Sequence, residues 1–282
     1  MNRSGRRSRQ AVRRGTAAVA TSVVAAALLG AGAGVAQAAV DPGLGYDPVA
    51  DKGSLYNVAE VVGAHASWQA GYTGKGVGVA LIDTGVAPVK GLTSGNVVNG
   101  PDLSFDSQDP DFAHLDAYGH GTHMASIIAG RDAAGTPKSY ADPARFNGIA
   151  PDATLVNVKV GASDGSVDVT QVIAAIDWVV EHKADHNIRV ISLSYGTDST
   201  ASNSTDPLAF AVENAWKQGV VVVVSGGNDG RSELTLADPA SDPYVLAVGA
   251  ADTKGTASAV DDSKSPMTRP RSARSWSVRA LR

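Results

Sequence analysis

Three polar side chains beside apolar runs have the types needed for acid–base chemistry at a carbonyl group. Asp83 directly follows the apolar run 77–82, His120 precedes a helix-like apolar run, and Asn228 comes shortly after the run 220–224. A histidine can act as a general base when a carboxylate holds its second ring nitrogen, and Asp83 could supply that carboxylate. A side-chain amide beside glycines, such as that of Asn228, is a good donor to an oxyanion.

Each of these residues also has an ordinary structural explanation. Asp-Thr-Gly at Asp83 and Asn-Asp-Gly at Asn228 are common turn sequences, and a single histidine is often a packed or surface residue. His120 and His123 have the spacing of two metal ligands on a helix, but no Glu lies between them and no other histidine follows a matching pattern. We therefore expect no metal here, and the case for chemistry depends on the residues occurring together.

The elements that would position these residues follow from the pattern of apolar residues. Short apolar runs rich in β-branched residues predict buried strands at 77–82, 153–160, 189–195, 220–224 and 244–250. Helical spacing of apolar residues predicts helices at 58–70, 121–130, 169–182 and 208–216, the last of them ended by Gly219. This alternation predicts an α/β fold, a mostly parallel sheet with helices on both faces. Ligands of such sheets bind at the carboxyl ends of the strands, where Asp83 would stand.

Longer motifs surround the candidate residues in a fixed order along the chain. They are Leu81-Ile82-Asp83-Thr84-Gly85-Val86, Gly119-His120-Gly121-Thr122-His123-Met124-Ala125, Asn147-Gly148-Ile149-Ala150-Pro151, Val158-Lys159-Val160 with Ser163-Asp164-Gly165-Ser166, and Ser192-Leu193-Ser194-Tyr195-Gly196. In this order, and followed by Asn228, they resemble the motifs of the subtilisin family of serine endopeptidases, with Met124 where the family usually has valine. The resemblance spans roughly residues 57–255.

The resemblance implies a subtilisin-like fold and the hydrolysis of peptide bonds. It implies Asp83 as the orienting carboxylate, His120 as the general base and Asn228 as the oxyanion donor. The implied partner is a polypeptide substrate, bound by a monomer that needs no cofactor. The Asp-rich loop 102–116 could hold structural calcium, but carboxylate density alone does not assign a site.

The resemblance also implies a cleft with two walls. An extended peptide would lie between the walls and add a strand by main-chain hydrogen bonds. The wall residues are Ser163, Asp164 and Gly165 on one side and Ser194, Tyr195 and Gly196 on the other.

The family's nucleophile is the serine of a Gly-Thr-Ser-Met-Ala motif at the start of a long buried helix, and this sequence has no such motif. Ser258 follows Asn228 too closely and leads into no apolar helical pattern. We therefore expect a chain that lacks the nucleophile, is inactive as written and is incomplete at the C-terminus of its fold. The Pro/Arg/Ser-rich segment 260–282 is expected to be a disordered basic tail, explained by a frameshift, by decay of the gene or by a natural tail.

Residues 1–38 have the layout of a secretory signal peptide. An Arg-rich start is followed by an uncharged Ala/Val/Leu-rich stretch, 16–35, and by small residues at a cleavage point. A retained membrane anchor is the alternative, but Ala and Gly make the stretch a weakly hydrophobic span. We expect a secreted, extracellular protein that is free of the membrane after cleavage, with 39–56 as an N-terminal arm and 57–259 as a partial peptidase domain.

Charge and cysteine content argue against some other classes of function and of stabilisation. Residues 41–263 hold 12 basic and 28 acidic residues, a net charge of −16, which argues against nucleic acid as a partner. The chain has no cysteine, so no disulfide can stabilise it. A non-catalytic, secreted peptide-binding module with the same cleft walls is the alternative function. Nucleotide binding at the glycines of 74–78 is not expected, because they precede a strand whereas a dinucleotide fingerprint follows one.

Overall fold

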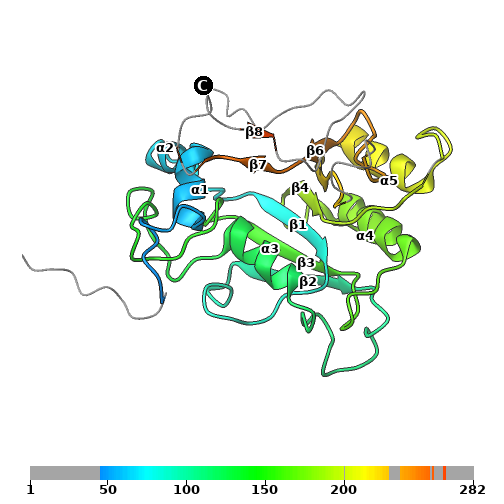
Figure 1. Cartoon of the computed structure of the whole chain (residues 1–282). Coiled ribbons are helices and arrows are strands. Elements are labelled where there is room, and N and C mark those ends of the chain that lie inside the picture. The colour runs from blue at the N-terminus through cyan, green and yellow to red at the C-terminus, as the bar shows by residue number, and fades with distance from the viewer. Residues whose placement is uncertain (1–44, 200, 229–235, 255, 257–262, 265–282) are drawn as a thin grey trace, which may run out of the picture. The chain divides into compact units, whose positions relative to one another are not determined.

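The computed structural model describes residues 45–199, 201–228, 236–254, 256 and 263–264 (Figure 1). The chain divides into two units, Met1–Val40 and Asp41–Arg282, and every described element lies in the second. The expected signal peptide 1–38 lies outside the described residues, as do Ser258 and most of the expected tail 260–282. None of the described helices is long and apolar enough to cross a membrane.

The described unit is built on a six-stranded sheet in which every neighbouring pair of strands is parallel. In spatial order the strands are β2 (Val97–Asp102), β3 (Thr154–Lys159), β1 (Gly78–Asp83), β4 (Ile188–Leu193), β5 (Val221–Ser225) and β6 (Leu246–Val248). A separate antiparallel pair consists of β7 (Ala251–Asp252) and β8 (Ser263–Lys264). The prediction of a mostly parallel sheet is confirmed.

Strand β2 is the one strand of the main sheet that the apolar runs did not predict. Its sequence, Val-Val-Asn-Gly-Pro-Asp, contains only two β-branched residues, followed by four residues of types that are rare in strands. The strand lies at the edge of the sheet, where a proline can be accommodated because one side of the strand makes no ladder hydrogen bonds.

Helices cover both faces of the sheet, as predicted (Figure 1). They are α3 (His120–Ala129) on one face and α4 (Val169–His182) with α5 (Pro207–Lys217) on the other. Alternate residues of β1 belong to the two cores. Leu81 packs in the core that contains α3, and Ile82 in the core that contains α4 and α5. All six residues of β1 are buried, which places its last residue, Asp83, at the end of the most enclosed strand.

The helix predicted at 58–70 is wrong as one element, because it is two short helices. They are α1 (Leu55–Val61) and α2 (Ala64–Gln69). Gly63 separates them with φ 78°, a left-handed conformation that glycine adopts without strain and that a continuous helix does not contain. The predicted end of α5 is confirmed, since Gly219 has φ 85° and its N–H donates to the carbonyl oxygen of Trp216.

Candidate active site

Asp83 and His120 form a hydrogen-bonded pair at the carboxyl edge of the sheet. The Nδ1 atom of His120 lies 2.7 Å from Oδ1 of Asp83. The Asp83 side chain is 3% exposed and the His120 side chain 42% exposed. Because an ionised carboxylate only accepts hydrogen bonds, the proton of a neutral His120 ring sits on Nδ1. The Nε2 atom, which carries the free lone pair, is then the basic nitrogen of the ring.

The close approach of α3 to the turn after β1 explains this geometry. A Cβ atom at Gly121 would lie only 2.2 Å from the carbonyl oxygen of Gly85 and 3.2 Å from Oδ1 of Asp83. Only a residue without a side chain lets the first turn of the helix come this near. Gly121 is therefore required to bring the imidazole of His120 within hydrogen-bonding distance of the carboxylate.

The sheet order explains why the two predicted cleft walls lie on either side of Asp83. Strands β3 and β4 are the two neighbours of β1, and the segments 163–165 and 194–196 follow their carboxyl ends. A cavity of about 350 Å³ lies between them. Its lining includes the predicted residues Asp83, His120, Gly165, Ser194 and Tyr195. The structure therefore brings both predicted walls and the Asp–His pair together.

The other predicted wall residues border this cavity without lining it. The N–H of Ser163 donates to Asp106, and Asp164 is exposed and accepts a hydrogen bond from the N–H of Ser166. Gly196 packs closely on Ala237, where a Cβ atom at Gly196 would lie 2.8 Å from Cβ of Ala237. These residues therefore shape the walls rather than face the pair.

Asn228 lies three residues beyond the carboxyl end of β5, the strand next to β4. It is exposed, and among the described residues it is not part of the cavity lining. The structure thus places Asn228 at the same edge of the sheet as Asp83. The residues that follow, 229–235, lie outside the described part.

Sequence reasoning missed Thr84, Asp116 and Tyr118. Thr84 and Tyr118 line the cavity, and the Tyr118 ring packs on Gly165, where an added Cβ would meet Cε2 at 2.7 Å. Asp116 is buried and accepts hydrogen bonds from the N–H groups of Gly119 and Thr122. An aspartate three residues before the glycine that begins a helix was the available signal for Asp116.

The second wall is supported by a pair of buried carboxyl groups. Thr197 and Asp238 form an antiparallel bridge just after the wall, and Asp238 is 4% exposed. Burial raises the pKa of Asp238 to about 6, and the nearby charge of Asp206, a hydrogen bond with Asp206 and the charge of Asp242 add to that rise. Asp206 keeps the N-terminus of α5 capped by accepting hydrogen bonds from the N–H groups of Leu208 and Ala209.

Two carboxylates of the acidic loop 102–116 lie near a buried lysine. Asp102 and Asp106 approach the ammonium of Lys159, at 4.0 and 3.8 Å, and the Lys159 side chain is completely buried. The single positive charge of Lys159 thus offsets one of these two negative charges. Within the described ranges, no group of three or more Asp, Glu, His or Cys side chains is arranged to hold a metal ion.

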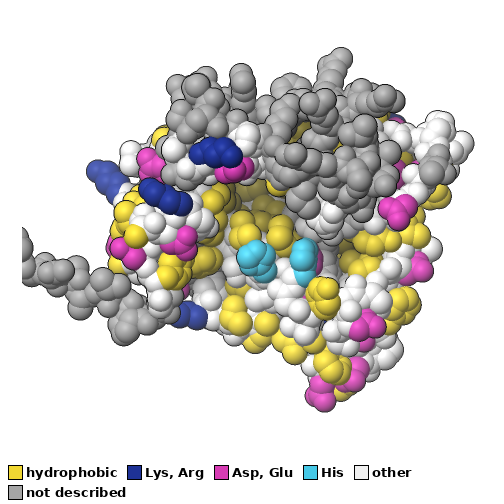
Figure 2. All heavy atoms as spheres, in the orientation of Figure 1, with side chains coloured by type: hydrophobic (Ala, Val, Ile, Leu, Met, Phe, Trp, Pro, Cys, Tyr) yellow, Lys and Arg dark blue, Asp and Glu magenta, His cyan; other side chains and the backbone are white. Residues whose placement is uncertain are grey.

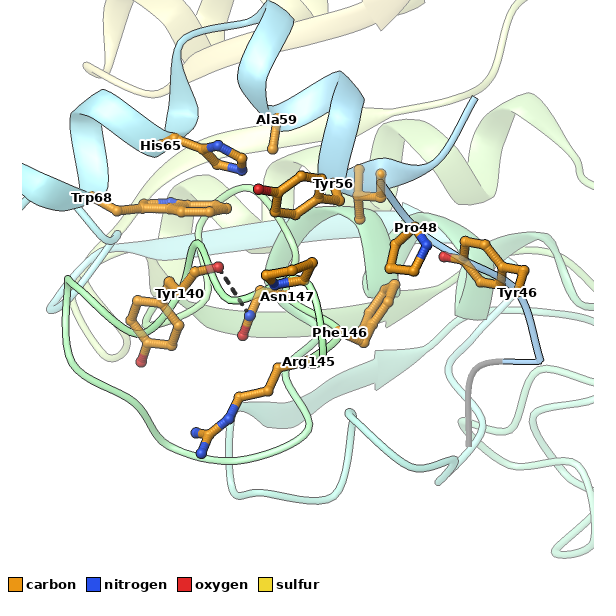
Figure 3. Close-up of a pocket in the computed structure, with 12 residues that line it drawn as sticks. Tyr46, Pro48, Tyr56, Ala59, His65, Trp68, Tyr140, Arg145, Phe146 and Asn147 are labelled. Carbon is orange, nitrogen blue, oxygen red and sulfur yellow. Dashed lines mark hydrogen bonds between the residues drawn. The ribbon is translucent and has the colours of Figure 1, made fainter. Parts of the chain in front are cut away.

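A second cavity lies between α1, α2 and the loop 140–147, away from the Asp83–His120 pair (Figure 3). Tyr56, His65, Trp68 and Tyr140 contribute to its lining. Its volume is about 20 Å³, enough for one water molecule. It cannot hold a peptide, so the larger cavity beside His120 is the candidate active site.

Figure 2 shows the face that carries α3, with histidine side chains exposed at its centre beside a hollow lined by hydrophobic side chains. The His120 side chain is 42% exposed. A base at this position is accessible to a substrate, while its carboxylate partner is shielded from water.

Comparison with known proteins gives the family. The model of the subtilase family matches residues 74–280. The serine protease AprX of Bacillus subtilis (strain 168) is 36% identical over 195 residues, which cover 67% of this chain and 41% of AprX. The major intracellular serine protease of the same organism is 34% identical over 207 residues, covering 72% of this chain and 60% of the relative.

Subtilisin DY of Bacillus licheniformis is 35% identical over 185 residues, covering 65% of this chain and 59% of the relative. The matched part thus spans about two fifths to three fifths of the length of these curated relatives. The family model covers well over half of the chain. Its match includes strand β1 with Asp83, helix α3 with His120 and both walls of the site. The chain belongs to the subtilase family.

Proposed function

We propose that this chain carries the base and the orienting carboxylate of a subtilisin-type serine endopeptidase. The observation that carries the proposal is the 2.7 Å contact between Nδ1 of His120 and the buried Oδ1 of Asp83. His120 Nε2 would take the proton of a serine hydroxyl as that oxygen attacks a peptide carbonyl, and would then give the proton to the leaving amine. Asp83 would stabilise the imidazolium formed between these steps.

Asn228 is proposed as the donor to the oxyanion of the tetrahedral intermediate. Its place beyond the carboxyl end of β5, at the edge where Asp83 ends β1, supports this role. A side-chain amide aimed at the developing charge contributes about 10²–10³ in rate in subtilisin itself.

The nucleophile is the part of the machinery that remains unassigned. In the part of the chain that the structure describes, no serine hydroxyl is hydrogen-bonded to His120, and the full sequence has no Gly-Thr-Ser-Met-Ala motif. Loss of the serine lowers kcat by about 2 × 10⁶ in subtilisin, which is the worked case for this effect. We therefore propose that the chain as written does not hydrolyse peptides at an enzymatic rate.

The second candidate function is a non-catalytic peptide-binding module. The cavity of about 350 Å³ between the two walls favours it, because both walls follow neighbouring strands and can offer main-chain groups to an extended peptide. This function needs the walls but not the basicity of His120.

Two measurements on the full chain separate these functions. A fluorophosphonate probe labels a serine that is activated by a base, so labelling that disappears in His120→Ala would reveal an active peptidase and contradict the proposed inactivity. Binding of an unlabelled peptide library without probe labelling would support the binding module. Absence of both labelling and binding would contradict the binding module and agree with an inactive peptidase. His186→Ala, at an exposed histidine outside the cavity lining, is the matched control for loss of an imidazole.

Secretion to the extracellular space is proposed from the sequence of residues 1–38, with a monomeric, membrane-free product and polypeptides rather than nucleic acid as partners. Family membership alone does not decide the compartment, since one relative is named an intracellular protease and another, the minor extracellular protease Epr, an extracellular one. Export from a bacterial host with an N-terminus near Ala39 would support secretion. Retention of the intact chain in the cells would contradict it.

A further inference from the structure

A second buried carboxylate, that of Asp116, lies beside the Asp83–His120 pair and binds the backbone on both sides of the histidine. The Asp116 side chain accepts the N–H of Gly119 at 2.6 Å on Oδ1 and the N–H of Thr122 at 2.7 Å on Oδ2. Asp116 is 7% exposed. One rigid anion therefore fixes the residue before the histidine and the second residue after it.

Asp116 takes the place of a helix cap. Gly119 begins α3 with φ 104° and has no side chain with which to cap the helix. The first N–H groups of a helix lack partners within the helix, so another group must satisfy them. Asp116 accepts the N–H of Thr122, and Thr84 Oγ1 accepts the N–H of Gly121 at 2.9 Å. A negative charge at this end is also favoured by the helix dipole.

Asp116 remains ionised at neutral pH despite its burial. Burial raises the pKa of Asp116, but hydrogen bonds from the Thr122 side chain, from the N–H groups of Gly119 and Thr122 and from the Thr84 hydroxyl outweigh it. Together they hold the pKa of Asp116 below its ordinary value. The group is therefore a permanent acceptor under the conditions in which His120 would act as a base.

The Thr84 hydroxyl connects the two carboxylates. Its Oγ1 lies 2.8 Å from Oδ1 of Asp116 and 3.3 Å from Oδ1 of Asp83. A hydroxyl group has one proton to donate, and the shorter distance assigns that proton to Asp116. The Asp83 oxygen then accepts the Thr84 N–H, at 2.8 Å, and the His120 Nδ1–H.

We propose that Asp116 is a positioning residue, which draws the Thr84 proton away from Asp83 and so leaves the Asp83 oxygen free to hold the His120 ring. The inference rests on the proposed function for the role of His120 as a base, but the geometry on which it depends is measured without substrate. If Asp116 is removed, the Thr84 proton can turn to Asp83 and compete with His120 Nδ1–H for the same oxygen.

The test uses the downfield proton NMR signal of His120 Nδ1–H in the full chain, assigned by its loss in His120→Ala. We expect Asp116→Ala to move this signal upfield and to speed its exchange with water. We expect Thr84→Val in the Asp116→Ala background to restore it, because valine has a similar shape and no competing proton. A residue that acted only as a helix cap would give a double variant that is no better than Asp116→Ala.

Asp168→Ala is the control, because Asp168 is an aspartate that accepts a backbone N–H, that of Thr170, at the N-terminus of another helix, α4. It should leave the His120 signal unchanged. If Asp116→Ala does not fold, Asp116→Asn keeps one acceptor oxygen and should give an intermediate upfield shift. An unchanged His120 signal in a folded Asp116 variant would overturn the inference. A double variant whose His120 signal lies further upfield than that of Asp116→Ala would also overturn it. Absence of the signal in the unaltered chain would contradict the Asp83–His120 pair itself, whereas failure of probe labelling and peptide binding would leave these outcomes intact.

Discussion

The two halves of the sheet differ in how they are packed on the face that carries α3. In the half formed by β2, β3 and β1, Leu155 is fully buried in the core that contains α3. On the same face of the other half, Val223 of β5 is only half-buried. Its neighbour Val222, which points to the opposite face and to α4 and α5, is fully buried. The lower burial is therefore confined to one face of β5 and does not extend to the whole strand.

This difference separates the parts of the candidate site. Asp83 and His120 come from the half that contains the buried strand β1 and helix α3, and the proposed oxyanion donor Asn228 follows β5 in the other half. Precise orientation of a catalytic group depends on a packed support. The described packing thus supports the base and its carboxylate more completely than it supports Asn228.

The largest effect is expected from matched leucine truncations in the two halves. Leu155→Ala should lower the free energy of unfolding by about 2–5 kcal/mol, because it leaves a cavity in a closed core. Leu246→Ala should cost less than half as much, because Leu246 in β6 is only half-buried. Urea denaturation of both variants measures the difference. Equal losses would show that the two halves are equally packed.

The stability of the two halves of the sheet should also change with pH in opposite directions. The pKa of Asp238 is raised to about 6, so its contribution to stability is fully present below the unfolded pKa of about 3.8 and is lost as pH rises through about 6, at most about 3 kcal/mol. The pKa of Asp116 is lowered, so its contribution is present above pH 3.8 and lost as pH falls through the lowered pKa.

Residue-resolved hydrogen exchange between pH 3 and pH 8 can follow both changes. Amides near Thr197 should lose protection with rising pH, and amides at the start of α3 should lose it with falling pH. Asp238→Asn should abolish only the first change. A loss near Thr197 that persists in Asp238→Asn would assign the pH response to another group.

A methyl group at Gly121 should disturb the packed half at the pair itself. Gly121→Ala would place Cβ 2.2 Å from the Gly85 carbonyl oxygen, and such overpacking costs about 1–3 kcal/mol. We expect loss of the downfield His120 signal together with this destabilisation. Gly53→Ala is the control, because its nearest neighbour would be Asp51 Oδ1 at an ordinary 3.5 Å. A retained signal in Gly121→Ala would show that α3 can move without breaking the pair.

The smallest expected effect compares the two faces of β5 directly. Val222→Ala should destabilise the chain by about 1 kcal/mol more than Val223→Ala, since one side chain is fully buried and its neighbour is not. Thermal unfolding of the two variants provides the measurement. A larger loss in Val223→Ala would mean that its face is covered by residues outside the described part.

The sequence predicted the elements whose signals are local. Continuous apolar runs located five strands of the parallel sheet, and helical spacing located α3, α4 and α5. The Asp83–His120 contact was also predicted, because a general base needs an acceptor for its second ring nitrogen and the motifs around both residues resemble those of the subtilisin family. The edge strand β2 and the break at Gly63 were not predictable in this way, since neither leaves an apolar pattern.

The missed residues of the site act through contacts between distant parts of the chain. Asp116 and Thr84 are 32 positions apart, and their hydrogen bond exists only because the loop before α3 returns to the end of β1. Tyr118 likewise meets Gly165 across the cleft. Residue types and spacing identify the reacting groups, but the groups that hold them in place depend on how the loops close.

Lys159 bears on how readily proteases can cleave this chain. Its buried ammonium donates to the carbonyl oxygens of Phe112 and Leu115, at 2.7 and 2.9 Å, and thereby fastens the long loop before His120 from beneath. Long surface loops are where proteases usually cut, since cleavage requires the backbone to extend into a foreign cleft. A loop tied to the interior by its own carbonyl groups resists that extension. The buried lysine would therefore protect this loop from cleavage by other proteases.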